Sequence, residues 1–331
     1  MANRKWHPGE LLELSGYFWK TCTLHAAIKL DVFTFLGDKH MSADAVAAGL
    51  KVAPDAVQRL LNALVAMELL AKAGDQYANS PSSAAFLSKK SPQYLGNIIM
   101  HHHHLVESWA QLDVSVQTGK PVRQRSSFSD EEWRESFLMG MFNMAMNMAP
   151  MLIPEIDISA RRHLLDIGGG PGTYAIHFCR HNPDLKATVF DLPTTRPFAE
   201  QTIKRFELSD RIDFQAGNYL KDEIKGRYDA AWLSHILHGE GPDGCHQIIQ
   251  KAVAALKPGG IIIIHEFILN NSMDGPLFPA LFSLNMLLGT EAGQAYSEQQ
   301  LRGMLSAAGA KEINRLPVRT PNDSGIITAL I

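Results

Sequence analysis

Residues 164–173 read Leu-Leu-Asp-Ile-Gly-Gly-Gly-Pro-Gly-Thr, and residues 186–191 read Lys-Ala-Thr-Val-Phe-Asp. Each stretch contains an apolar strand with an acid at or near its end, Asp166 in the first and Asp191 in the second. The glycines between them permit positive φ angles and let the backbone approach a ligand closely, which a Cβ would resist. Such a strand, glycine turn, helix and acid-tipped second strand predict a site for a nucleotide-like ligand, with the second acid on its ribose.

S-adenosylmethionine fits this pattern better than a dinucleotide does. The dinucleotide fingerprint has a third small residue, usually glycine, where this chain has Thr173. Asp166 would repel a pyrophosphate, but it can hold an ammonium group directly or through water. We therefore expect Asp166 to face the amino-acid end of S-adenosylmethionine and Asp191 to accept the ribose hydroxyls. The alternative is a tight turn that only packs a helix on a sheet.

From residue 163 onward, strands alternate with helices, which is typical of a doubly wound, mostly parallel α/β sheet. We predict strands at 163–167, 186–190, 211–215, 228–233, 260–266, 312–316 and 325–331. In such Rossmann-like sheets the ligand binds at the carboxyl ends of the strands. The side chains at or just beyond these ends are Asp166, Asp191, Asn218, His238 and Glu266.

The residues that follow the later strands suggest the chemistry. Asn218 can bond an adenine edge and Tyr219 can flank its face, although Asn218 is equally suited to capping a turn. Of the two histidines after the fourth strand, His238 lies further out than His235 and is the better general base, since imidazole accepts a proton near neutral pH. Glu266 can hold the far ring nitrogen of His238 and fix its tautomer. A purely structural histidine is the alternative.

The first half of the chain is expected to form a mainly helical domain over residues 1–155, followed by a cofactor-binding catalytic domain over 156–331. Apolar spacing predicts helices at 11–36, 43–50 and 55–70, then a short hairpin at 69–79, which together make a winged-helix pattern. Helix 55–70 carries Arg59 as its only basic residue. We therefore expect it to pack rather than read DNA, and keep a ligand-sensing regulator as the alternative class.

The composition describes a soluble protein without a charged partner. The chain has 331 residues, 46% of them hydrophobic, and a net charge of −3, so nothing draws it toward nucleic acid or an anionic membrane. Cys22, Cys179 and Cys245 lack CxxC spacing, which favours free thiols in the cytoplasm. The N-terminal residues contain no apolar run of signal-peptide or membrane-span length. The run His101–His104 does not predict a metal site, because successive helical residues point about 100° apart.

Taken together, the motifs resemble the S-adenosylmethionine-dependent O-methyltransferases with an N-terminal dimerisation domain, a family that includes plant caffeate, hydroxyindole and bacterial polyketide enzymes. The likeness covers nearly the whole chain and rests on Leu165–Gly172, Phe190–Pro193, Gly217–Asn218, Ile236–His238 and Leu256–Gly260. It implies a homodimer, a small and aromatic hydroxyl acceptor, no metal, and His238 as the base with Glu266 beside it. It also places Phe137 and Met141, in a methionine-rich segment, against the acceptor.

The cofactor site predicted in this way comprises nine residues: Asp166, Gly168, Gly170, Asp191, Leu192, Asn218, Tyr219, Ser234 and His235. The chain departs from the family pattern at two of these nine residues and at several positions around the base. Asn218 replaces a usual Asp, Ser234 a common Lys or Arg, His238-Gly239-Glu240 a common His-Asp-Trp, and Ala295 a second glutamate. The alternatives left open are an enzyme of the same fold that methylates nitrogen, or one that uses the cofactor without methyl transfer. A nicotinamide dehydrogenase is disfavoured by Asp166 and Thr173.

Overall fold

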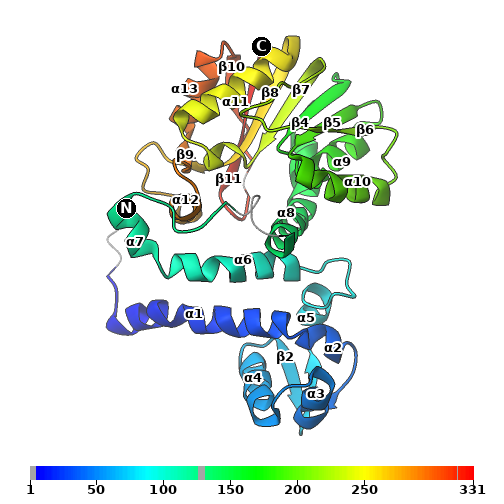
Figure 1. Ribbon diagram of the computed structural model, residues 1–331, viewed down its shortest axis with the longest axis vertical. Helices are drawn as coiled ribbons and strands as arrows, with labels where there is room; N and C mark the ends of the chain where they lie inside the picture. The colour runs from blue at the N-terminus through cyan, green and yellow to red at the C-terminus, as the bar shows by residue number, and fades with distance from the viewer. Residues whose placement is uncertain (1–4, 126–130, 319) are drawn as a thin grey trace. The chain divides into compact units, whose positions relative to one another are not determined.

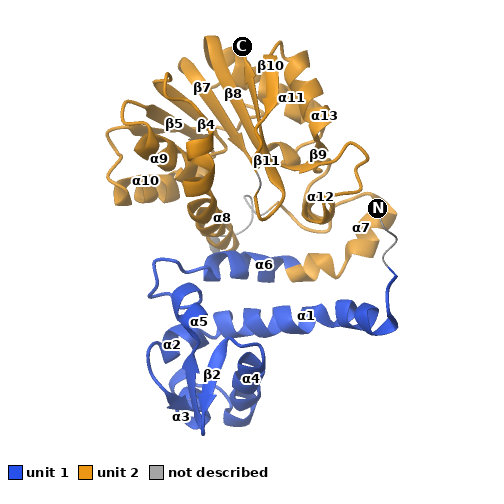
Figure 2. Ribbon diagram, turned by 180° about the vertical axis from the view of Figure 1, so that it is seen from behind, with its two compact units in different colours: residues 1–105 blue, residues 106–331 orange. Residues whose placement is uncertain are grey.

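The computed structural model describes residues 5–125, 131–318 and 320–331. The chain forms two compact units, residues 1–105 and 106–331, which Figure 2 draws in different colours. These units are defined by compactness, whereas the boundary predicted at 155/156 separates a helical dimerisation domain from the cofactor-binding catalytic domain. That division by role stays a prediction.

The first unit is mainly helical. Its helices are α1 (Pro8–Lys29), α2 (Val32–Leu36), α3 (Ala43–Leu50), α4 (Pro54–Ala66), α5 (Pro81–Phe86) and the start of α6 (Gly96–Trp109). The strands β1 (Met41–Ser42), β2 (Leu70–Ala73) and β3 (Gln76–Asn79) form a small antiparallel sheet in the order β1-β3-β2. Helix α4 buries Val57, Leu61 and Leu64 in the core of this unit, as expected for a packing element rather than a DNA-reading helix.

The second unit is built on one large sheet with the strand order β10-β11-β8-β7-β4-β5-β6, and a short β9 pairs with β8 (Figure 1). Its strands are β4 (His163–Ile167), β5 (Lys186–Asp191), β6 (Ile212–Ala216), β7 (Tyr228–Ser234), β8 (Leu256–Leu269), β9 (Tyr296–Ser297), β10 (Lys311–Arg315) and β11 (Ser324–Leu330). The pairs among β4 to β8 are parallel, and β11 joins β8 and β10 antiparallel. The predicted mostly parallel, doubly wound α/β fold is confirmed.

Helices cover both faces of this sheet, because successive residues of each central strand are apolar and point alternately to its two faces. On one face α11 (Pro242–Ala255) and α13 (Glu298–Ala307) pack in a core with Leu165, Leu233 and Ile264. On the other face α9 (Thr173–His181) and α10 (Arg196–Arg205) pack in a core with Leu164, Trp232 and Ile263. Figure 1 shows the two pairs of helices on either side of the strands. Burial on both faces leaves the strand ends as the place for polar side chains.

Three further helices complete the second unit: α7 (Leu112–Thr118), α8 (Glu131–Leu152) and α12 (Leu277–Gly289). By length and composition alone, the segment Trp133–Glu155 is long and apolar enough to cross a membrane, with a mean hydropathy of 1.3. Ala149, Leu152 and Ile153 are, however, buried in the same core as α9. The C-terminal end of this segment therefore packs in the core of the second unit.

Candidate active site

The glycine turn after β4 is shaped by steric demands. Gly168 and Gly170 have φ angles of +66° and +55°, which favour glycine. A Cβ on Gly168 would lie 2.5 Å from the side chain of Ile236, and one on Gly169 would lie 2.6 Å from the Asp166 carboxyl. A Cβ on Gly170, by contrast, would meet nothing within 4 Å. The turn is thus packed on its inner side and open at Gly170, as a cradle for a ligand requires.

Asp166 lies at the bottom of this turn and is 1% exposed. Its Oδ2 atom makes no hydrogen bond within the described part of the chain. Burial raises its pKa to about 7, although a hydrogen bond from the backbone of Ala175 acts in the opposite direction. A buried carboxyl oxygen without a partner is costly. It fits the ammonium group of S-adenosylmethionine, which would supply both the missing hydrogen bond and the opposite charge.

Asp191 ends β5 and is fixed by the backbone around it. Its Oδ2 accepts a hydrogen bond from the Gly170 amide at 2.8 Å. Its Oδ1 accepts from the Leu192 amide at 2.6 Å and from Thr195 Oγ1 at 3.1 Å. A carboxylate has about four lone-pair positions, and three are used by these bonds, so Asp191 keeps one for a ribose hydroxyl and accepts from a second only by exchanging a bond such as that from Thr195. Leu192 therefore serves this site through its amide, and its own contact with a cofactor stays a prediction.

Asn218 and Tyr219 follow β6 and already have partners in the protein. Asn218 Oδ1 accepts from the Leu220 amide at 2.9 Å, so the turn-capping alternative is realised. The Tyr219 hydroxyl lies 2.7 Å from Arg125 Nη2 and 3.0 Å from Glu240 Oε1. Their predicted roles at the adenine ring are untested by these contacts and stay predictions.

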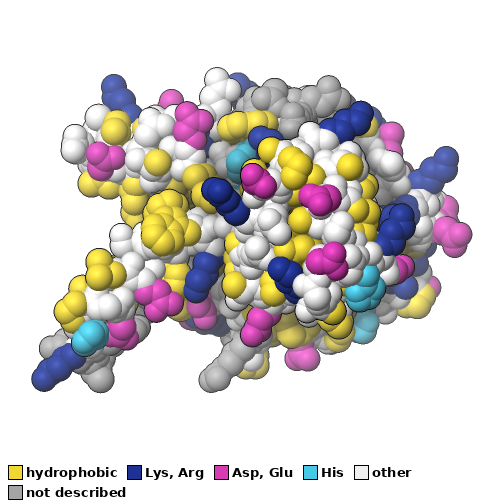
Figure 3. Space-filling view, turned by 90° about the horizontal axis from the view of Figure 1, so that it is seen from below, with side chains coloured by type: hydrophobic (Ala, Val, Ile, Leu, Met, Phe, Trp, Pro, Cys, Tyr) yellow, Lys and Arg dark blue, Asp and Glu magenta, His cyan; other side chains and the backbone are white. Residues whose placement is uncertain are grey.

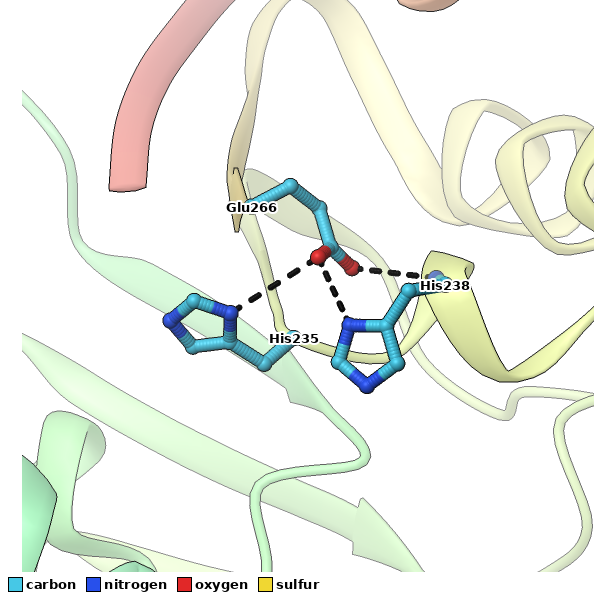
Figure 4. Close-up of side chains that lie close together, drawn as sticks. All are labelled: His235, His238 and Glu266. Carbon is cyan, nitrogen blue, oxygen red and sulfur yellow. Dashed lines mark hydrogen bonds and ion pairs between the residues drawn. The ribbon is translucent and has the colours of Figure 1, made fainter. Parts of the chain in front are cut away.

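His238 and Glu266 form the hydrogen-bonded pair predicted from the sequence (Figure 4). His238 Nδ1 lies 2.8 Å from Glu266 Oε2. The backbone amides of Leu237 and His238 donate to Oε1 of the same carboxyl at 2.9 and 3.3 Å. Burial alone would raise the pKa of Glu266, but the charges of His238 and His235 and the hydrogen bond from His238 hold it below its usual range. Glu266 is therefore a carboxylate that orients His238 and leaves the other ring nitrogen available.

His235 and Ser234 surround this pair without joining it as closely. His235 Nδ1 lies 3.6 Å from Glu266 Oε2, and burial lowers its pKa. Its ring packs between His265 and Phe267, with centroid distances of 4.3 and 4.2 Å. The Ser234 hydroxyl lies 3.0 Å from His265 Nδ1. The predicted cofactor contacts of His235 and Ser234 stay predictions.

The ligand atoms of His235, His238 and Glu266 all lie within 4.8 Å of one another, a grouping that can also hold a metal ion. Two ligand atoms bound tetrahedrally to zinc, each about 2.0–2.1 Å from the ion, lie roughly 3.4 Å apart. The 2.8 Å between His238 Nδ1 and Glu266 Oε2 is instead a hydrogen-bond distance. The geometry thus favours a hydrogen-bonded base.

Two features of the site were not predicted from the sequence. The first is an aromatic wall: Phe282 of α12 meets the His238 ring edge-on at 4.7 Å, and Phe267 lies 4.5 Å from Phe282. Phe267 follows Glu266 directly in the sequence, so its place next to a predicted site residue could have indicated that it lies near the base. The second is the ion pair between Arg125 and Glu240, for which the sequence held no signal. Phe137 and Met141 lie half-buried on α8, and their contact with an acceptor stays a prediction.

A doubly wound sheet with a glycine turn, two acids and a His–Glu pair along its carboxyl edge is the arrangement expected of a methyltransferase. The comparisons with known families agree. Residues 12–89 match the O-methyltransferase dimerisation domain, and residues 116–311 match the O-methyltransferase domain. The chain belongs to the O-methyltransferase family and is an enzyme of the methyltransferase class. The resemblance stated from the sequence is confirmed.

Three of its relatives align along nearly the full length of the chain. The 3-hydroxy-5-methyl-1-naphthoate 3-O-methyltransferase of Streptomyces sahachiroi is 30% identical, over 98% of this chain and 95% of its own. The tetracenomycin polyketide synthesis 8-O-methyl transferase of Streptomyces glaucescens is 30% identical, over 96% of both chains. Human N-acetylserotonin methyltransferase, solved in complex with SAM, has a TM-score of 0.88 and 26% identity, covering 100% of this chain and 99% of its own.

Proposed function

We propose that this protein transfers a methyl group from S-adenosylmethionine to a hydroxyl group of a small aromatic molecule, with His238 as the general base. The observation that carries the proposal is the 2.8 Å contact between His238 Nδ1 and the buried Glu266 carboxylate. Asp166, Gly170 and Asp191 would hold the cofactor by its ammonium group, backbone face and ribose. When bound, the cofactor supplies a methyl carbon that a sulfonium already activates.

The contribution of the protein is then to position the acceptor and to remove a proton. Glu266 accepts from Nδ1–H of His238, so Nε2 carries the lone pair that takes the proton of the acceptor hydroxyl. The carboxylate stabilises the imidazolium that results. Proton removal by a positioned base contributes about 10²–10⁴ in rate. Alignment of the reacting groups contributes several further kcal/mol, on the order of those measured for intramolecular reactions.

The acceptor class follows from the surroundings of the base. Phe267 and Phe282 present aromatic faces and edges beside His238, which suits a flat aromatic ring. Relatives named for a hydroxynaphthoate and for N-acetylserotonin agree with such an acceptor. Use of the cofactor without methyl transfer would leave the buried carboxylate behind His238 without a purpose. Methylation of nitrogen stays the alternative, because an N–H acceptor also has a proton for His238 to remove.

We infer that the protein works as a homodimer in the cytoplasm. The match to a dimerisation domain supports the first part. Hydrophobic side chains are exposed on the face drawn in Figure 3, and α1 exposes several of the largest in the molecule: Leu12, Phe18 and Trp19 are 75%, 60% and 70% exposed. The three cysteines are free thiols, as a reducing compartment would keep them.

Calorimetric titration with S-adenosylmethionine, S-adenosylhomocysteine and NAD tests the cofactor assignment. We expect micromolar binding of the first two and none of NAD. Asp191→Ala should lose this binding, whereas Asp213→Ala, which removes an exposed acid from β6, should keep it. Binding of NAD alone, or of none of the three, would refute the assignment.

A further inference from the structure

Residues 122–125 make hydrogen bonds and an ion pair to two other parts of the second unit: helix α12 and the turn that carries His238. The amides of Val122 and Arg123 both donate to the Leu288 carbonyl of α12, at 3.0 and 3.2 Å. The Arg123 side chain donates to the side-chain and backbone oxygens of Asn285 on the same helix. Arg125, two residues on, reaches a different place, the loop that carries His238.

Arg125 joins two sides of the candidate active site. Its Nη1 pairs with Glu240 Oε1, and its Nη2 donates to the Tyr219 hydroxyl at 2.7 Å. The Tyr219 hydroxyl also donates to Glu240 Oε1, at 3.0 Å, so the three groups form a closed triangle. Tyr219 follows β6 on the side predicted for the adenine ring, and Glu240 lies two residues after the base.

The local backbone leaves room for this arginine. The guanidinium of Arg125 occupies the space that a Cβ of Gly239 would need. Gly239 follows His238 directly and ends the short 3-10 turn η4 (Leu237–Gly239). It is also one of the positions at which the chain departs from the pattern it resembles. Arg125 can therefore take this position only because residue 239, next to the base, is a glycine.

The main chain of Glu240 is held independently of its side chain. Its carbonyl accepts from the Tyr296 hydroxyl at 2.6 Å, and its amide donates to the Leu237 carbonyl at 3.0 Å. Without Arg125, the Glu240 carboxylate would lose its cation and Gly239 its cover; these main-chain bonds would remain, but they do not tie the turn to Tyr219. The positive charge of Arg125 also acts on Asp191, lowering its pKa against the effect of burial.

We propose that Arg125 is a positioning residue for the reaction: by binding Glu240 and Tyr219 together, it holds the turn that carries His238 in register with the cofactor site. This inference rests on the proposed function. Its consequence is that cofactor-side and base-side residues move together, so loss of Arg125 misplaces the base more than it weakens binding. A misplacement of about 1 Å costs on the order of 10²-fold in rate.

Steady-state kinetics of Arg125→Met and Arg123→Met tests the proposal. The two arginines lie on the same segment, but Arg123 contacts α12 rather than the base-carrying turn, so it is the matched control. We expect Arg125→Met to lower kcat about 10–100-fold with the Kd for S-adenosylmethionine raised less than tenfold, and Arg123→Met to leave kcat within about threefold. Arg125→Lys should not restore kcat, because an ammonium lacks the planar fork that reaches two acceptors.

Glu240→Gln, which breaks the same ion pair from the other side, replaces Arg125→Met if that variant fails to fold, with the same expected loss of kcat. Where both single variants fold, the double variant Arg125→Met/Glu240→Gln completes the test. If Arg125 and Glu240 act only through their ion pair, the kcat of the double variant will be no lower than that of the slower single variant. Multiplicative losses, a wild-type kcat in Arg125→Met, or equal losses in the Arg123 and Arg125 variants would overturn the inference. These outcomes leave the proposed function standing, whereas a wild-type protein that neither binds nor uses S-adenosylmethionine would remove both.

Discussion

Single residues in this site have ionisation states set by their burial and partners. Glu266 is buried yet charged, because two backbone amides and the His238 ring satisfy its oxygens. Asp166 is equally buried, but its Oδ2 has no hydrogen bond within the described residues, and burial raises its pKa to about 7. The Glu266 carboxylate thus has its hydrogen bonds within the protein, whereas Asp166 Oδ2 would gain one from a bound ligand.

The raised pKa of Asp166 predicts proton-linked cofactor binding. Below about pH 7 the free protein holds Asp166 neutral, whereas an ammonium ligand favours the carboxylate. Binding must therefore release a proton, and the affinity for S-adenosylmethionine should rise as the pH increases from about 6 to about 8. Calorimetry in two buffers of different ionisation enthalpy measures the proton count. Asp166→Asn should abolish the release, and an affinity that falls over this range in wild type would contradict the assignment.

At the scale of helices and strands, the spacing of apolar residues and the residue types found in turns predicted most elements. Strand β4 has the predicted bounds, β5 and β7 are one residue longer at the C-terminal end, and β6 is shifted by one residue at both ends. The helix predicted over 55–70 ends at Ala66, because Glu68 takes a φ of +60° and Leu70 then pairs with Asn79 in the hairpin. Apolar spacing continues through Leu69 and Leu70, so sequence periodicity alone could not place that break.

Contacts between distant segments could not be predicted in this way. Strand β8 runs over 256–269 rather than 260–266, since its ends gain partners in Tyr228 and β9 that only the folded sheet provides. Arg125 and Glu240 are 115 residues apart, and no periodicity relates them. The residues at strand ends, Asp166, Asp191, His238 and Glu266, were accessible to prediction because the fold itself brings such ends together.

Two glycine substitutions should have opposite effects on the free energy of unfolding. Gly303 lies exposed within α13, and a Cβ there would meet nothing within 4 Å. Gly303→Ala should therefore stabilise the protein by about 0.5–1 kcal/mol. Gly168→Ala, with a positive φ and a clash with Ile236, should destabilise it by roughly 1–3 kcal/mol. Urea unfolding measures both, and a Gly168→Ala protein as stable as wild type would contradict the described turn.

At the scale of the whole molecule, exposed apolar surface on α1 predicts self-association. Large hydrophobic side chains gathered on one element mark an interaction site. Light scattering at micromolar concentration should give the mass of a dimer, and Leu12→Asp/Trp19→Ser should give that of a monomer. Leu277→Ser is the control, because Leu277 is 74% exposed but lies on α12. A monomeric wild-type protein, or a dimer unaffected by the α1 changes, would contradict the prediction.

The central claim is methyl transfer to an aromatic hydroxyl with His238 as base, and a methyl-transfer assay tests it most directly. Wild type, His238→Ala and His246→Ala would be given isotopically labelled S-adenosylmethionine and a panel of hydroxynaphthoates and hydroxyindoles. His246 lies half-buried on α11, so it controls for loss of a histidine. We expect labelled methyl ethers from wild type and His246→Ala, and a kcat lowered about 10²–10⁴-fold in His238→Ala with cofactor binding retained. An unimpaired His238→Ala enzyme, or label found only on nitrogen, would contradict the account.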